Sequence, residues 1–139
     1  MDDGEALRAA VQYEILSTAP SYSYTFELAT NSPKTVELTS GYEYAVTASG
    51  QATLWAENPD FPVSSPSGNG TTCNTYNCLV PGAPTGALVV KVGDSSWSLL
   101  GSHGTLNLPY PEEVSFSVND RRLEDNIGAY RVNITRIRQ

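Results

Sequence analysis

Histidine is nearly absent from this 139-residue chain, which contains only His103. The sequence also lacks the Gly-x-Ser-x-Gly elbow of a nucleophilic serine and a glycine-rich phosphate loop. A glycosidase needs two carboxylates that face one cleft, whereas the acidic residues here concentrate where they would be metal ligands. We therefore do not expect an enzyme.

Positive charge is scarce as well. Lys and Arg number 8 against 15 Asp and Glu, which gives a formal net charge of -7. No basic face could offset phosphate repulsion, so we expect no nucleic-acid partner. The arginines gather late in the chain as a local patch that is typical of a solvated strand end: Arg121, Arg122, Arg131, Arg136 and Arg138.

Long apolar runs are missing, and none approaches the length of a membrane span. The first five residues are acidic and lack the basic and apolar regions of a signal peptide. Three origins fit such a start: an intracellular protein, a mature chain given a new Met, or a piece of something longer.

The chain has two cysteines, Cys73 and Cys78. Two thiols do not make a closed tetrahedral zinc site, and His103 lies far along the sequence. A local disulfide that closes a small loop is the better interpretation, provided that the compartment is oxidising.

What the chain does have is alternation of apolar and polar residues. Residues 1–21 form an N-terminal arm, in which 5–16 could be a helix and 11–17 could equally be a strand. From residue 22 to residue 139 we expect one all-β domain, a jelly-roll-like β-sandwich of about eight or nine strands. The expected strands cover residues 22–28, 35–38, 42–48, 52–55, 86–93, 97–100, 105–108, 114–118 and 130–137, with turns at Ser49-Gly50 and around His103.

Residues 58–84 interrupt this pattern with five prolines and many small polar residues. Long ordered loops are often functional, and an exposed tolerant insertion is the alternative interpretation. The cysteine pair lies inside this segment, where a disulfide would brace it.

A short loop late in the chain concentrates oxygen donors: Asn119, Asp120, Asp125 and Asn126. Such donors repel one another unless a cation lies between them, and calcium accepts many oxygens in loose geometry. Asp and Asn also favour turns for local reasons. We interpret this loop as a calcium site.

Several segments together resemble the LecA-like (PA-I type) family of calcium-dependent galactophilic bacterial lectins and related modules of secreted enzymes. They are Gly86-Ala87-Leu88-Val89-Val90-Lys91-Val92-Gly93, Val118-Asn119-Asp120, residues 125–134, the Cys-x4-Cys pair and residues 46–52. The resemblance covers roughly residues 35–134. It implies that sugar hydroxyls complete the coordination of one calcium ion, and it favours a secreted or cell-surface setting over the cytoplasm.

Transferred onto this sequence, the family pattern assigns Asp120 and Asp125 as side-chain ligands of Ca²⁺, with Asn126 beside them. Backbone carbonyls near Leu123 and at Leu54, or at Trp55, would complete the protein's share. Gly128 would let the chain turn back into its strand.

The family holds the sugar's primary hydroxyl with a His and a Gln, whose positions here fall at about Pro66 and Asn69. Asn69 can still make hydrogen bonds, but Pro66 cannot replace an imidazole. We therefore assign Asn69, Trp55, Asp120 and Asp125 to ligand binding, with Trp55 as the candidate for stacking on a sugar ring.

Two functions fit these observations. The first is a calcium-dependent carbohydrate-binding domain, a lectin or an appended module, for a hexose such as galactose. The second is a structural or assembly subunit of a surface, fibre or tail that uses calcium only as a staple. In that case the N-terminal arm could dock on a neighbour in a homo-oligomer or larger assembly.

Overall fold

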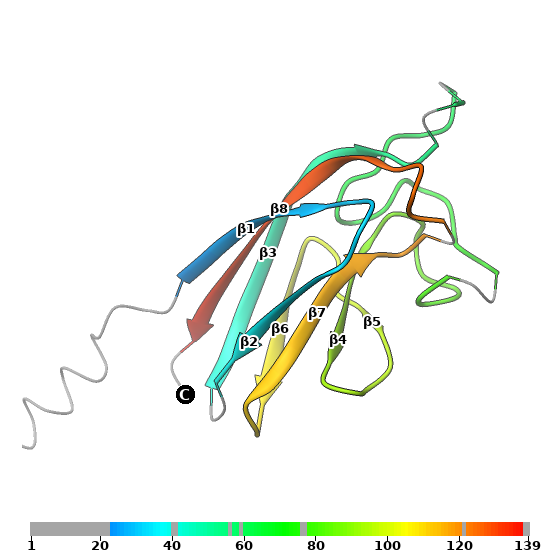
Figure 1. Ribbon diagram of the computed structural model, residues 1–139. Coiled ribbons are helices and arrows are strands. Elements are labelled where there is room, and N and C mark those ends of the chain that lie inside the picture. The colour runs from blue at the N-terminus through cyan, green and yellow to red at the C-terminus, as the bar shows by residue number, and fades with distance from the viewer. Residues whose placement is uncertain are drawn as a thin grey trace, which may run out of the picture.

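The computed structural model describes residues 23–39, 42–55, 57–58, 60–75, 78–120 and 122–137. These residues form eight strands in two four-stranded antiparallel sheets (Figure 1). The strands are β1 (Ser23–Ala29), β2 (Lys34–Leu38), β3 (Tyr42–Thr53), β4 (Leu88–Val92), β5 (Ser98–Leu99), β6 (His103–Leu108), β7 (Glu112–Val118) and β8 (Ile127–Ile137). The helix or strand expected within residues 1–21 lies outside the described residues.

The strand order confirms the predicted all-β jelly-roll sandwich. One sheet has the order β1-β8-β3-β6 and the other β2-β7-β4-β5. Only β4 and β5 are consecutive strands of one sheet, and every other connection crosses to the opposite sheet. Two interleaved antiparallel sheets of this kind define an eight-stranded jelly roll.

The core lies between the sheets and follows from the period-two pattern. In most strands the inward positions are apolar and the outward ones polar, so each sheet buries the face toward the other sheet. The largest fully buried side chains are Tyr44, Tyr130, Phe116, Leu28, Leu88, Leu108 and Ile134. β4 is buried on both faces near its start, as its continuous apolar sequence predicted, because Leu88, Val89 and Val90 are all buried.

The turn predicted at Ser49-Gly50 is wrong. β3 runs unbroken through both residues, with Ser49 opposite Arg131 and Gly50 opposite Tyr130 on β8. Gly50 has a φ of 115°, and a Cβ atom there would lie 2.9 Å from the carbonyl oxygen of Ala129. The glycine therefore serves close approach of two strands, not chain reversal.

Isolated bridges hold the described part of the segment between β3 and β4: Ala52 to Ser64, Ser65 to Gly68 and Thr72 to Pro84. Cys73 and Cys78 form the predicted disulfide, and both are buried. This excursion, green in Figure 1, and the orange segment after β7 lie at the same end of the sandwich.

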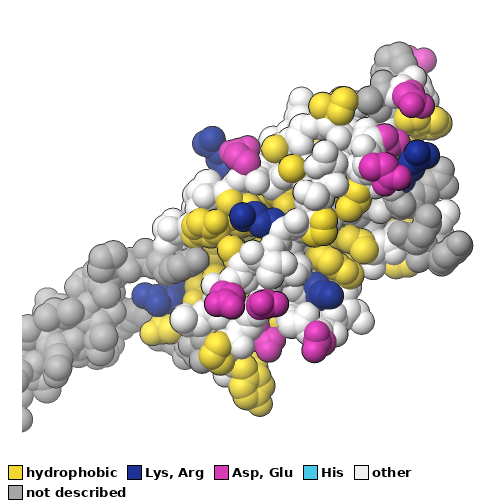
Figure 2. Space-filling view, in the orientation of Figure 1, with side chains coloured by type: hydrophobic (Ala, Val, Ile, Leu, Met, Phe, Trp, Pro, Cys, Tyr) yellow, Lys and Arg dark blue, Asp and Glu magenta, His cyan; other side chains and the backbone are white. Residues whose placement is uncertain are grey.

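The described residues contain no helix long and apolar enough to cross a membrane. On the face shown in Figure 2, Lys and Arg side chains are scattered singly among Asp and Glu. His103, expected in a turn, is instead the exposed first residue of β6.

Candidate functional site

The pairing of β3 with β8 brings together two segments that are far apart in the sequence. Thr53 lies opposite Ile127 at the last pair of this ladder. The chain leaves β3 through Leu54 and Trp55, and it enters β8 from Asp125 and Asn126. The register of the ladder therefore places these two short segments beside each other at one end of the sandwich.

Asn119 fixes the third segment of the site. It follows β7 directly and is fully buried. Its Oδ1 accepts the N–H of Val80 at 2.8 Å, and its Nδ2 lies within hydrogen-bond distance of the carbonyls of Val80, Ala83 and Pro84. The side chain thus attaches the start of the oxygen-rich loop to the disulfide-bearing excursion, and Asp120 comes next in the chain.

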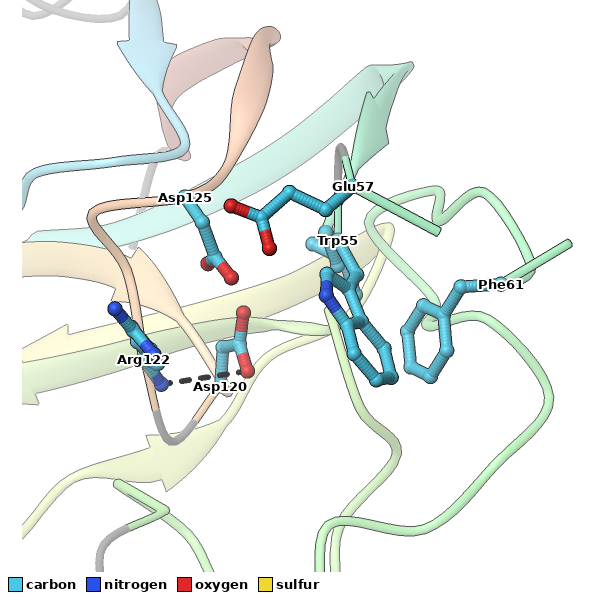
Figure 3. Close-up of a pocket in the computed structure, with 7 residues that line it drawn as sticks. Trp55, Glu57, Phe61, Asp120, Arg122 and Asp125 are labelled. Atoms are coloured by element: carbon cyan, nitrogen blue, oxygen red, sulfur yellow. Dashed lines mark hydrogen bonds between the residues drawn. The ribbon is translucent and has the colours of Figure 1, made fainter. Parts of the chain in front are cut away.

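These segments enclose a pocket of about 280 Å³. Its described lining is Leu54, Trp55, Glu57, Phe61, Asp120, Arg122 and Asp125. Figure 3 shows the carboxylates of Glu57, Asp120 and Asp125 turned toward the same space, with the Trp55 ring beside Asp120. Trp55 is 43% exposed, and its ring meets that of Phe61 edge to face at 5.6 Å.

Two consecutive residues of the site have buried oxygens without hydrogen bonds. Oδ1 of Asp125 and Oδ1 of Asn126 accept none from any described residue. The Asn126 side chain is oriented by its Nδ2, which donates to the carbonyl of Thr30 at 2.9 Å, and the residue is only 4% exposed. Buried polar oxygens are costly to leave unsatisfied, so each needs a donor or a cation.

The positive side chain at the pocket is engaged elsewhere. Arg122 donates from Nε to the carboxylate of Glu124 at 3.2 Å, and both side chains are exposed. Its backbone N–H contacts Oδ1 of Asp120 at 3.4 Å, the dashed line of Figure 3. Within the described chain, the carboxylates of Glu57 and Asp125 form no ion pair.

Tyr130 on β8 braces the site from the core. Its hydroxyl lies 2.9 Å from Ser64 Oγ, 2.9 Å from the carbonyl of Ser65 and 2.8 Å from that of Gly86. Burial raises the pKa of Tyr130 from 10.0 to about 12; the Ser64 hydrogen bond opposes this rise and the charge of Asp120 adds to it. The phenol therefore stays neutral and joins the start of the excursion to Gly86, just before β4.

The predicted site residues are partly brought together. Leu54, Trp55, Asp120 and Asp125 line the pocket, and Asn126 adjoins Asp125. Leu123 packs partly buried against the core, and its carbonyl accepts the N–H of Asn126. Asn69 is not part of the pocket lining; its Oδ1 accepts from Thr71, and its Nδ2 is buried without a described partner.

Sequence reasoning missed Glu57 and Phe61. Both lie close after Trp55, so an acidic and an aromatic residue just beyond the end of β3 were the signal that could have revealed them. Gly128, the second residue of β8, has a φ of 112°, and a Cβ atom there would lie 2.8 Å from the carbonyl oxygen of Gln51. Like Gly50, it permits the close approach of β3 and β8, and its role in turning the chain stays a prediction.

A preformed cluster of charged metal ligands is not present among the described residues, where no three His, Cys, Asp or Glu side chains are arranged to hold an ion. Glu57, Asp120 and Asp125 therefore share one pocket without meeting at one metal-binding point. A calcium ion would depend on the oxygens of Asn126 and of backbone carbonyls as well, a donor set that suits calcium.

No protein-family model and no curated protein matches this sequence. Solved structures do match, among them the N-terminal domain of EclA, described as a PllA-like lectin, with a TM-score of 0.60 and 20% identity. The match covers 82% of this chain and 96% of that one. This chain therefore has a lectin-like β-sandwich fold.

Proposed function

We propose that this protein is a calcium-dependent carbohydrate-binding domain. The side chains of Asp120, Asp125 and Asn126 and the carbonyls of Leu123 and Leu54 would hold Ca²⁺. The ion would supply electrostatic attraction for sugar hydroxyls in its remaining coordination positions. The lectin-like fold of the chain supports this assignment.

The observation that carries the proposal is the pair of buried oxygens on Asp125 and Asn126, which have no hydrogen bond from any described residue. A carboxylate held away from water is destabilising unless it is paired or coordinates a cation. The two oxygens belong to consecutive residues, and one cation bound by both would satisfy them.

Sugar binding is supported by the aromatic side chains of Trp55 and Phe61, which line the same pocket as Asp125. The exposed Trp55 ring offers an apolar face for the C–H side of a hexose, and Phe61 buttresses it edge to face. The pocket volume of about 280 Å³ suits one or two sugar rings at an open site. Asn69 is proposed to contact a part of the glycan that extends beyond this pocket.

A calcium-stapled structural or assembly subunit is the second candidate, and Pro66 favours it. At this position the galactophilic lectins have a histidine that contacts sugar. Pro66 is buried here, and its carbonyl accepts the N–H of Leu88 at 2.8 Å. The residue thus serves to hold the loop against β4.

One titration separates the two candidates. Calcium is added with and without galactose and other simple hexoses while Trp fluorescence and thermal stability are followed. A sugar-dependent fluorescence change that EDTA abolishes supports the carbohydrate-binding domain. Thermal stabilisation by calcium, with no response to any glycan on an array, would reject sugar binding and leave the structural subunit.

The disulfide bears on where the domain would work. Cys73–Cys78 is formed in this structure, and disulfides persist in oxidising compartments. A secreted or cell-surface setting is therefore proposed, as suits a protein that meets glycans.

A further inference from the structure

Glu57 is an exposed charged group in the lining of the pocket. Its side chain is exposed, and it makes no hydrogen bond or ion pair with any other described residue. Figure 3 nevertheless shows its carboxylate pointing into the space shared with Asp120 and Asp125, next to Trp55. A carboxylate in this position is free to meet a ligand.

Among the described residues that line the pocket, Glu57 is the carboxylate to which no counter-charge is assigned. A divalent cation offsets the charges of Asp120 and Asp125, and the guanidinium of Arg122 is bonded to Glu124 through Nε. The described carboxylates do not converge on a single metal-binding point. With a cation bound by Asp120 and Asp125, Glu57 would remain as the described lining carboxylate that is available to a ligand.

We propose that Glu57 makes this pocket select amino sugars, such as a 2-amino-2-deoxyhexose, over neutral hexoses and uronic acids. The inference rests on the proposed carbohydrate binding and names the substrate class of that same pocket. A protonated amine would donate a charge-assisted hydrogen bond to the carboxylate. The exposed face of Trp55 adds attraction for the same cation.

A uronate would meet the opposite effect. Glu57 would repel its carboxylate. A neutral hexose would bind the calcium ion and would be neither attracted nor repelled by the charge of Glu57. Because Glu57 is exposed and screened by salt, we expect a preference of only about 5-fold between amino sugar and neutral hexose. A similar factor should separate the neutral hexose from the uronate.

Calorimetry with saturating calcium tests the proposal. Galactosamine, N-acetylgalactosamine, galactose and galacturonate are compared at about pH 6, where the free amine carries its proton. The wild type should prefer galactosamine, and N-acetylation should remove the preference. Glu57→Gln should abolish the ranking of the sugars by charge. Glu113→Gln, which removes an exposed carboxylate at the start of β7 outside this pocket's lining, is the matched control and should retain the ranking.

Three outcomes overturn the inference, and they differ in what they mean. If Glu57→Gln still binds galactose and still ranks the four sugars by their charge, Glu57 is not the cause of the ranking. A loss of calcium affinity of about 10-fold in this variant would make Glu57 a metal ligand instead. Calcium binding without affinity for any of the four sugars would reject the proposed function itself, and the inference with it.

Discussion

The side-chain amide of Asn119 pairs with the backbone of Val80 in both directions, accepting its N–H at 2.8 Å and donating to its carbonyl at 3.0 Å. This buried side chain therefore makes the two hydrogen bonds that a paired strand residue would make, and it joins segments that are 39 residues apart in the sequence. The disulfide-bearing excursion and the loop that begins at Asp120 depend on it for their relative position.

Asn119→Ala should be among the most destabilising substitutions in the chain. It leaves the N–H of Val80 and the carbonyls of Ala83 and Pro84 without their side-chain partner, and each unsatisfied buried group costs about 1–3 kcal/mol. We expect the free energy of unfolding in urea to fall by about 3 kcal/mol or more. Asn133→Ala, which removes an amide that bonds Thr25 on the exposed face of β8 and β1, should cost less than about 1 kcal/mol.

Asp125→Asn should act in opposite directions with and without calcium. In EDTA it removes a partly buried carboxylate that has no described partner, so the melting temperature should rise slightly. With calcium at about 100 times the wild-type Kd, the wild type should gain about 2.7 kcal/mol, and the variant should lose most of this gain. Differential scanning fluorimetry measures both effects. An unchanged calcium response would reject Asp125 as a ligand, and Glu113→Gln, which removes an exposed carboxylate outside this pocket, should behave as the wild type.

Tyr130 should make the fold sensitive to alkali. Its pKa in the folded protein is raised to about 12 from 10.0, so unfolding releases a proton between these values. Stability from this group is complete below pH 10.0 and falls as pH rises toward 12, by about 3 kcal/mol in total. Urea unfolding at several pH values should show a steeper alkaline decline for the wild type than for Tyr130→Phe. Parallel curves would contradict this assignment.

Gly86→Ala should destabilise the base of the pocket. Gly86 has a φ of 86°, and an added Cβ would lie 2.9 Å from Leu54 Cδ1 and closer still to the Ser64 side chain. Backbone strain and overpacking together should cost about 3 kcal/mol in urea unfolding. Gly82→Ala is the control, because its φ is 94° but no atom lies within 4 Å of the added group. It should cost only the strain, about 1–2 kcal/mol.

Strand positions could be predicted because they depend on local alternation and turn chemistry, as in residues 23–29 and 34–38. The turn predicted at Gly50 was wrong for a non-local reason. A glycine is needed there because the carbonyl of Ala129 on β8 comes close to it. Asp120 and Asp125 were found because they are close in sequence. Glu57 was missed because it joins them through the register of β3 with β8, and its position just after Trp55 was the one local sign of this.

The unbroken ladder of β3 and β8 has a consequence for how this protein can change over evolution. One residue inserted into either strand would turn every following side chain to the other face and separate Trp55 from Asp125. Insertions near exposed Gly70 or Gly82 would leave that spacing intact. Ligand preference can therefore diverge through the length and sequence of the excursion, while the distance between the aromatic wall and the acidic loop is inherited with the scaffold.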